Sequence, residues 1–90
     1  MATLEDMLLS ELGIRSRLNA LVHERAEALR EAERLHVRAT RPGGDPDLEQ
    51  QAGRWRTVAE RVAGEIEGKR TELREAEARV ATARADAAGA

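Results

Sequence analysis

Apolar residues recur at alternating spacings of three and four along the first part of the chain, which is the period of one helix face. These positions are Leu4, Met7, Ile14, Leu18, Leu21, Ala28, Ala32, Leu35 and Ala39. Thr3 stands before them as a helix N-cap, and Asp6 follows three residues later as in a capping box. No proline occurs before Pro42. The pattern predicts one long helix over residues 3–40.

The second part of the chain follows a stricter heptad repeat, in which one stripe of positions, here called the seam, faces a partner helix. The seam positions are Leu48, Ala52, Trp55, Ala59, Val62, Ile66, Lys69, Leu73, Ala76, Val80, Ala83 and Ala87. Lys69 is the one polar residue among them. The repeat predicts a second helix over about residues 46–84, followed by a frayed tail over residues 85–90.

A short segment rich in glycine and proline, residues 41–46, separates the two helical patterns. Pro42 disfavours a helical Arg41, and the two glycines permit positive φ. Asp45 followed by Pro46 is typical of an N-cap and first helical position. A loop this short turns the second helix back along the first. We therefore expect an all-α fold, a two-helix antiparallel coiled-coil hairpin that assembles into a four-helix bundle or docks on partner helices.

Folding the chain about the two glycines sets the register of the hairpin. It places Trp55 against Ala32, and Ile66 against Leu21. Large residues then face small ones beside the loop, as a packed seam requires. The register predicts a core that contains Leu18, Leu21, Leu35, Trp55, Val62, Ile66 and Leu73.

The charge distribution argues against several classes of partner. Charged residues make up 36% of the chain but nearly cancel, with a net charge of -2, so neither half has a basic footprint for nucleic acid or anionic lipid. Glu5, Asp6 and Glu11 interrupt the apolar start, which excludes a signal-peptide core or a membrane span there. The absence of cysteine suits a reducing cytoplasm. We expect a cytoplasmic homo-oligomer or a larger protein partner, with no nucleic acid and no membrane.

Catalytic chemistry finds no support in the sequence. Ser10 and Ser16 have neither a general base nor an oxyanion arrangement close in sequence. Trp55 lies between two arginines but is the sole aromatic residue, which is too few for a stacking platform. We therefore expect a non-enzymatic protein with no catalytic residues and no cofactor.

One pair of residues has the spacing of a metal-binding motif. Glu33 and His36 match the Glu-x-x-His of ferritin-like di-iron bundles. The predicted register places Arg54 opposite Glu33 and Gln51 opposite His36, so no second carboxylate faces the pair. We expect no metal, and a ferritin-like hairpin completed by oligomerisation stays an alternative.

A second alternative comes from one outer face of the second helix. Glu67, Thr71 and Arg74 have a spacing that resembles part of the Glu/Ser/Arg motif by which coiled-coil anti-sigma factors bind a cyclic dinucleotide. The family motif continues with Gln and Asp, whereas this chain has Ala78 and Thr82. The resemblance implies a small regulatory coiled-coil protein, anti-sigma-like or an adaptor, that a partner or ligand switches.

The half of the hairpin that carries the chain ends has an unusually apolar outer surface. Leu9 and Leu12 point away from the predicted seam, where they add to an exposed apolar patch. Gly64 and Gly68 lie one turn apart, although glycine inside a helix costs about 1 kcal/mol relative to alanine. They suggest close approach by another helix, or else they reflect the composition of a GC-rich genome. The predicted interface is Leu9, Leu12, Gly13, Ser16, Gly64, Gly68 and Thr71.

These observations together predict a non-enzymatic helical hairpin that serves as a protein–protein interaction or structural module. Self-association is the simplest way to cover the apolar outer surface, and docking on the helices of a larger protein would use the same residues.

Overall fold

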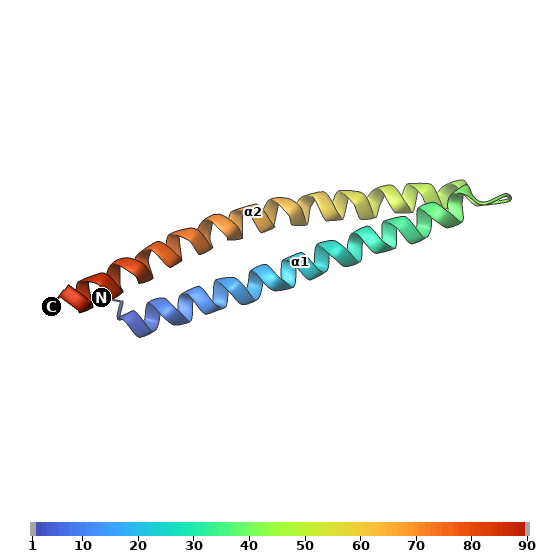
Figure 1. Ribbon diagram of the computed structural model, residues 1–90. Coiled ribbons are helices and arrows are strands. Elements are labelled where there is room, and N and C mark those ends of the chain that lie inside the picture. The colour runs from blue at the N-terminus through green and yellow to red at the C-terminus, as the bar shows by residue number, and fades with distance from the viewer. Residues whose placement is uncertain (1, 90) are drawn as a thin grey trace.

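The computed structural model describes residues 2–89, and this part of the chain forms two helices, α1 over Leu4–Thr40 and α2 over Pro46–Gly89. The helices run antiparallel and side by side, so the start of α1 and the end of α2 lie at one end of the molecule and the loop lies at the other (Figure 1). The molecule is a rod with extents of 72 × 17 × 14 Å. The predicted all-α antiparallel hairpin is confirmed.

The first helix begins where the sequence predicts. Thr3 Oγ1 accepts a hydrogen bond from the Asp6 amide at 3.1 Å, and the Thr3 amide donates to Asp6 Oδ2 at 3.2 Å. This reciprocal pair satisfies two amides that have no partner within the helix. At the other end, Arg41 has extended backbone angles, as expected for a residue before proline, and α1 stops at Thr40.

The loop depends on its two glycines for different reasons. Gly43 has a φ of 78°, in the left-handed region that side chains other than glycine disfavour. A Cβ on Gly44 would overlap the main-chain oxygens of Arg38 and Ala39, so the chain can pass close to the end of α1 only without one. Asp45 Oδ1 then accepts a hydrogen bond from the Asp47 amide at 2.9 Å, which caps the start of α2.

The end of α2 differs from the prediction. The sequence predicts a helix end near residue 84 and a frayed tail over 85–90, but α2 continues to Gly89. This prediction is wrong for residues 85–89, because the alanines of this segment are the strongest helix formers and no proline interrupts them. The predicted fraying of Ala90 lies outside the described residues.

The core is a single stripe between the helices. Its buried residues are Leu21, Ala28, Ala32, Leu35, Ala52, Ala59, Val62, Ile66, Ala76 and Val80. Leu21, Val62 and Ile66 form the central cluster, which confirms the predicted pairing of Ile66 with Leu21. Of the other predicted core residues, Leu35 is buried, whereas Leu18 and Leu73 are half-buried. No polar or charged residue is buried within residues 2–89.

Trp55 is the predicted core residue that the structure contradicts, because 40% of its surface stays exposed. It does occupy a seam position, but the residues that are buried at this level are its alanine neighbours. Ala28 and Ala32 of α1, and Ala52 and Ala59 of α2, are all buried, and alanines bring helix axes close together. The ring therefore lies along the outside of the helix pair instead of between the helices.

We predict that Leu21→Ala destabilises the hairpin more than Trp55→Ala does. Leu21 is fully buried, so truncation should lower the free energy of unfolding by about 2–5 kcal/mol. Trp55 is larger but 40% exposed, so its truncation leaves no enclosed cavity and should cost less. Urea denaturation followed by helical circular dichroism measures both changes, and a larger loss for Trp55→Ala would contradict the observed packing.

Candidate interaction surface

The predicted interface residues are all exposed, and they lie in two groups on different helices. Leu9 and Leu12 are 60% and 62% exposed, more than any other large hydrophobic residue within 2–89. Gly13 and Ser16 extend this group along α1. The α2 group consists of Gly64, Gly68 and Thr71, which are also exposed.

The structure does not bring these two groups together. Arg15 reaches Glu77 across the seam, with 3.7 Å between guanidinium and carboxylate, so the α1 group lies level with the last turns of α2. Val22 and Arg25 of α1 line one hollow together with Glu67 of α2. The α2 group, which surrounds Glu67 in sequence, therefore lies nearer the middle of the rod. The register that pairs Ile66 with Leu21 already implies this separation, because it sets Gly64 and Gly68 beside the middle of α1.

The glycines of the interface have no packing role within the chain. A Cβ built on Gly64 or Gly68 meets nothing within 4 Å, and the same holds for Gly13. Gly53, near the loop end of α2, is equally unconstrained. Internal packing therefore does not account for glycine at these positions.

On the outer face of α2 that carries Glu67, Thr71 and Arg74, the side chains already form hydrogen bonds with neighbours on the same helix. Arg74 donates a hydrogen bond to Thr71 Oγ1 at 3.2 Å. Arg70 donates to the Glu67 carboxylate at 2.6 Å, and the Thr71 hydroxyl donates to the Glu67 main-chain oxygen. An anionic ligand at this face would have to be bound by arginines that already have partners.

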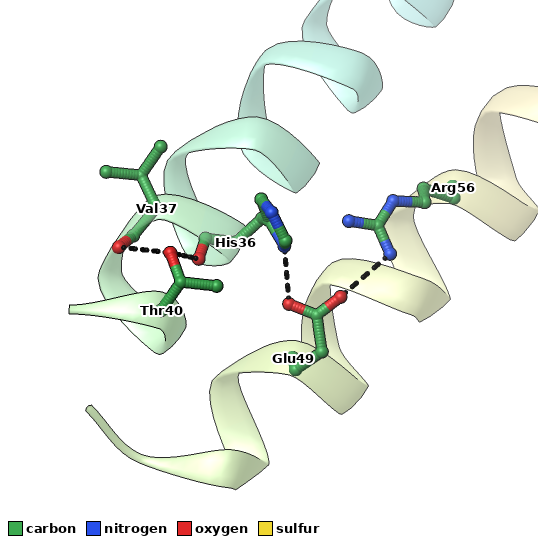
Figure 2. A network of polar contacts seen from close by, with 5 residues as sticks. All are labelled: His36, Val37, Thr40, Glu49 and Arg56. Carbon is green, nitrogen blue, oxygen red and sulfur yellow. Dashed lines mark hydrogen bonds and ion pairs between the residues drawn. The ribbon is translucent and has the colours of Figure 1, made fainter. Parts of the chain in front are cut away.

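A polar network joins the two helices near the loop (Figure 2). His36 Nδ1 lies 2.7 Å from Glu49 Oε2, and Arg56 donates a hydrogen bond to Glu49 Oε1 at 3.0 Å. On the α1 side, the Thr40 hydroxyl donates to the main-chain oxygens of His36 and Val37, which closes the last turn. The network ties the start of α2 to the end of α1.

This network corrects the register prediction for His36. The sequence places Gln51 opposite His36 and no carboxylate near it, but Glu49 is its partner. His36 follows the seam residue Leu35, and Glu49 likewise follows the seam residue Leu48, so the two side chains meet beside the seam. Gln51 instead precedes the seam residue Ala52. Glu33 takes no part in the network.

The Glu33 and His36 spacing therefore does not create a metal site by itself. Within residues 2–89 no group of three or more histidine, aspartate or glutamate side chains comes close enough to hold a metal ion. The absence of bound metal stays a prediction, although a carboxylate, that of Glu49, does face His36, contrary to the predicted register.

The surroundings of Glu49 give the network a defined pH dependence. The hydrogen bond with His36, followed by that with Arg56, holds the pKa of the Glu49 carboxyl below its ordinary value of 4.5. A carboxyl group with a lowered folded-state pKa stabilises the fold above its unfolded-state pKa, and this contribution is lost as the pH falls through the folded-state pKa.

We predict that Glu49→Gln is less stable than the wild type above pH 4.5, and that the difference disappears as the pH falls through the lowered folded-state pKa of Glu49, below which both side chains are uncharged. Thermal unfolding across a series of pH values checks this. A stability difference that persisted unchanged at the lowest pH would show that the carboxylate charge is not what Glu49 contributes.

Comparisons with known proteins assign no family to the chain. Models of protein families, curated proteins and solved structures were all compared, and none matched. Within residues 2–89, neither helix has a stretch apolar and long enough to cross a membrane.

We predict that Gly64→Ala and Gly68→Ala each raise the free energy of unfolding by up to about 1 kcal/mol, since alanine favours helix and finds open space at both sites. Gly53→Ala is the matched control and should stabilise to the same extent. If the α2 glycines admit a neighbouring helix, the first two changes should also weaken association, whereas Gly53→Ala should not. Destabilisation by any of the three would contradict the open surroundings.

Proposed function

We propose that the hairpin is a non-enzymatic protein–protein interaction and assembly module, and that it pairs with a second copy of itself through the outer face of the first half of α1. The observation that carries this proposal is the exposure of Leu9 and Leu12, 60% and 62%, on the face away from the seam. Pairing of two hairpins would form a four-helix bundle.

The residues around these leucines suit an isologous contact. Glu5, Leu9, Leu12 and Ser16 follow one another at spacings of four, three and four, so they share one helix face. An antiparallel pairing with the same face of a second copy places Leu9 against Leu12 and Glu5 against Ser16. No like charges oppose each other in this arrangement, and twofold pairing is the commonest form of oligomer.

Burial of the leucines supplies the driving force. Full burial of one leucine side chain contributes about 1.5–3 kcal/mol, and a twofold contact buries two from each copy. A chain of 90 residues has little core of its own, so the added burial matters more than it would in a larger domain.

The non-enzymatic part of the proposal is supported by how the possible catalytic groups are used. His23 contacts Glu27 and His36 contacts Glu49. No hydrogen bond joins Ser10 or Ser16 to a histidine within the described part of the chain. The proposed setting is the cytoplasm, because a chain without cysteine suits a reducing compartment.

We predict that the double variant Leu9→Glu with Leu12→Glu abolishes self-association, because four carboxylates would then meet in the twofold contact. Sedimentation analysis should show the wild type as a dimer and the variant as a monomer. Circular dichroism on the same samples should show that the variant keeps its helical hairpin.

The matched control is Leu29→Glu with Val37→Glu. These residues are also exposed hydrophobic side chains of α1, each 40% exposed, but they lie toward the loop. The control adds the same charge and should remain a dimer. A monomeric wild type, or equal loss of association in both double variants, would show that the Leu9 and Leu12 face is not an interface between copies.

A further inference from the structure

A groove beside Trp55 lies apart from the proposed self-association face. Trp55 and Val58 of α2 and Ala28 of α1 provide its apolar lining, and its volume is about 510 Å³. A second hollow of about 390 Å³, lined by Gln51 and Arg54, adjoins the same Trp55 and Val58 side chains. The indole therefore stands between two hollows with 40% of its surface free.

The α1 wall of this groove carries three glutamates and two arginines, a small acidic excess. Glu24, Glu27 and Glu31 line it at spacings of three and four residues, so all three lie along one side of the helix. Arg34 binds the Glu31 carboxylate through two nitrogens, and this contact lowers the pKa of Glu31. Within residues 2–89, the ion-pair partner of Glu27 is His23 alone, which is charged only when protonated, and Glu24 forms no ion pair.

The remaining charge in the groove favours a cationic occupant. Three carboxylates and the two guanidinium groups of Arg30 and Arg34 line it, which leaves one negative charge in excess. An ammonium or guanidinium group is attracted to the face of an indole, and its aliphatic stem packs on apolar side chains. A purely apolar group would instead remove water from Glu24 and Glu27 without giving them a partner.

From this combination we infer that the Trp55 groove binds a lysine or arginine side chain presented by a basic segment of a partner protein. The stem of that side chain lies on Trp55 and Val58, and its charged head lies between Glu24 and Glu27. The groove recognises a second partner while the leucine face of α1 pairs the hairpin with its own copy.

The experiment uses the fluorescence of Trp55, which is the sole aromatic residue and therefore reports on the groove directly. The full chain is titrated with a short alanine-based peptide that carries two lysines four residues apart. Two further peptides replace both lysines by norleucine or by glutamate, and a short oligothymidylate tests the indole as a nucleic-acid stacking site. We expect the lysine peptide to change the Trp55 fluorescence in a saturable way. The norleucine peptide, the glutamate peptide and the oligothymidylate should not change it.

Variants then locate the binding site. Glu24→Gln with Glu27→Gln should weaken binding of the lysine peptide about tenfold, since it removes both partners of the ammonium group. The control, Glu33→Gln with Glu60→Gln, removes the same charge from exposed positions outside the groove and should leave binding unchanged. Trp55→Leu, followed by calorimetry, keeps apolar bulk without the aromatic face and should also weaken binding.

Several results would overturn the inference. Equal binding of the norleucine peptide would make the groove merely apolar, and equal weakening by the control variant would indicate unspecific charge attraction. Binding of the oligothymidylate or the glutamate peptide would assign an anionic partner. Lack of saturation with the lysine peptide at millimolar concentration would leave the groove without the proposed occupant. Circular dichroism of each variant keeps loss of binding separate from loss of fold.

Discussion

Close approach of two helices along a seam rich in alanine is the constraint on which the rest of the structure depends. Ala28 and Ala32 of α1 and Ala52 and Ala59 of α2 are buried, so the two helices pack through small side chains on the loop side of the central cluster. Dispersion contacts between closely packed atoms, together with a few larger side chains around Leu21, hold the pair. Because the seam uses one stripe of each helix, every other face stays available to partners.

The same constraint explains which features the sequence could predict. The limits of α1, the capping box at Thr3 and the reversal at Gly43 depend on local chemistry, which can be read from the sequence. The pairing of Ile66 with Leu21 follows from counting residues outward from the loop. Trp55 could not be placed in this way, because its exposure depends on the distance between the helices and not on the heptad position.

The candidate surfaces show the same division between local and tertiary information. The exposure of Leu9 follows from periodicity alone, since one helical neighbour can cover only one face. The contact of His36 with Glu49 involves residues beside the seam, where no apolar pattern marks the register. The groove at Trp55 could not be predicted, because the heptad repeat places the indole inside the core, whereas the structure leaves it exposed.

The hairpin connection also affects the order in which contacts between the two helices form during folding. Residues next to the loop are close in sequence, so their contacts form at the smallest loss of chain entropy, and each later contact toward the open end closes a longer loop. The polar network of His36 and Glu49 lies at the loop end, where contacts form first. Leu9 and Leu12 lie at the open end, where contacts form last. Opening should begin where the chain ends lie, because terminal segments fray at the least cost. A second copy that binds there would therefore stabilise the open end of the hairpin as well as form a dimer. Folding of the open end would then be coupled to assembly.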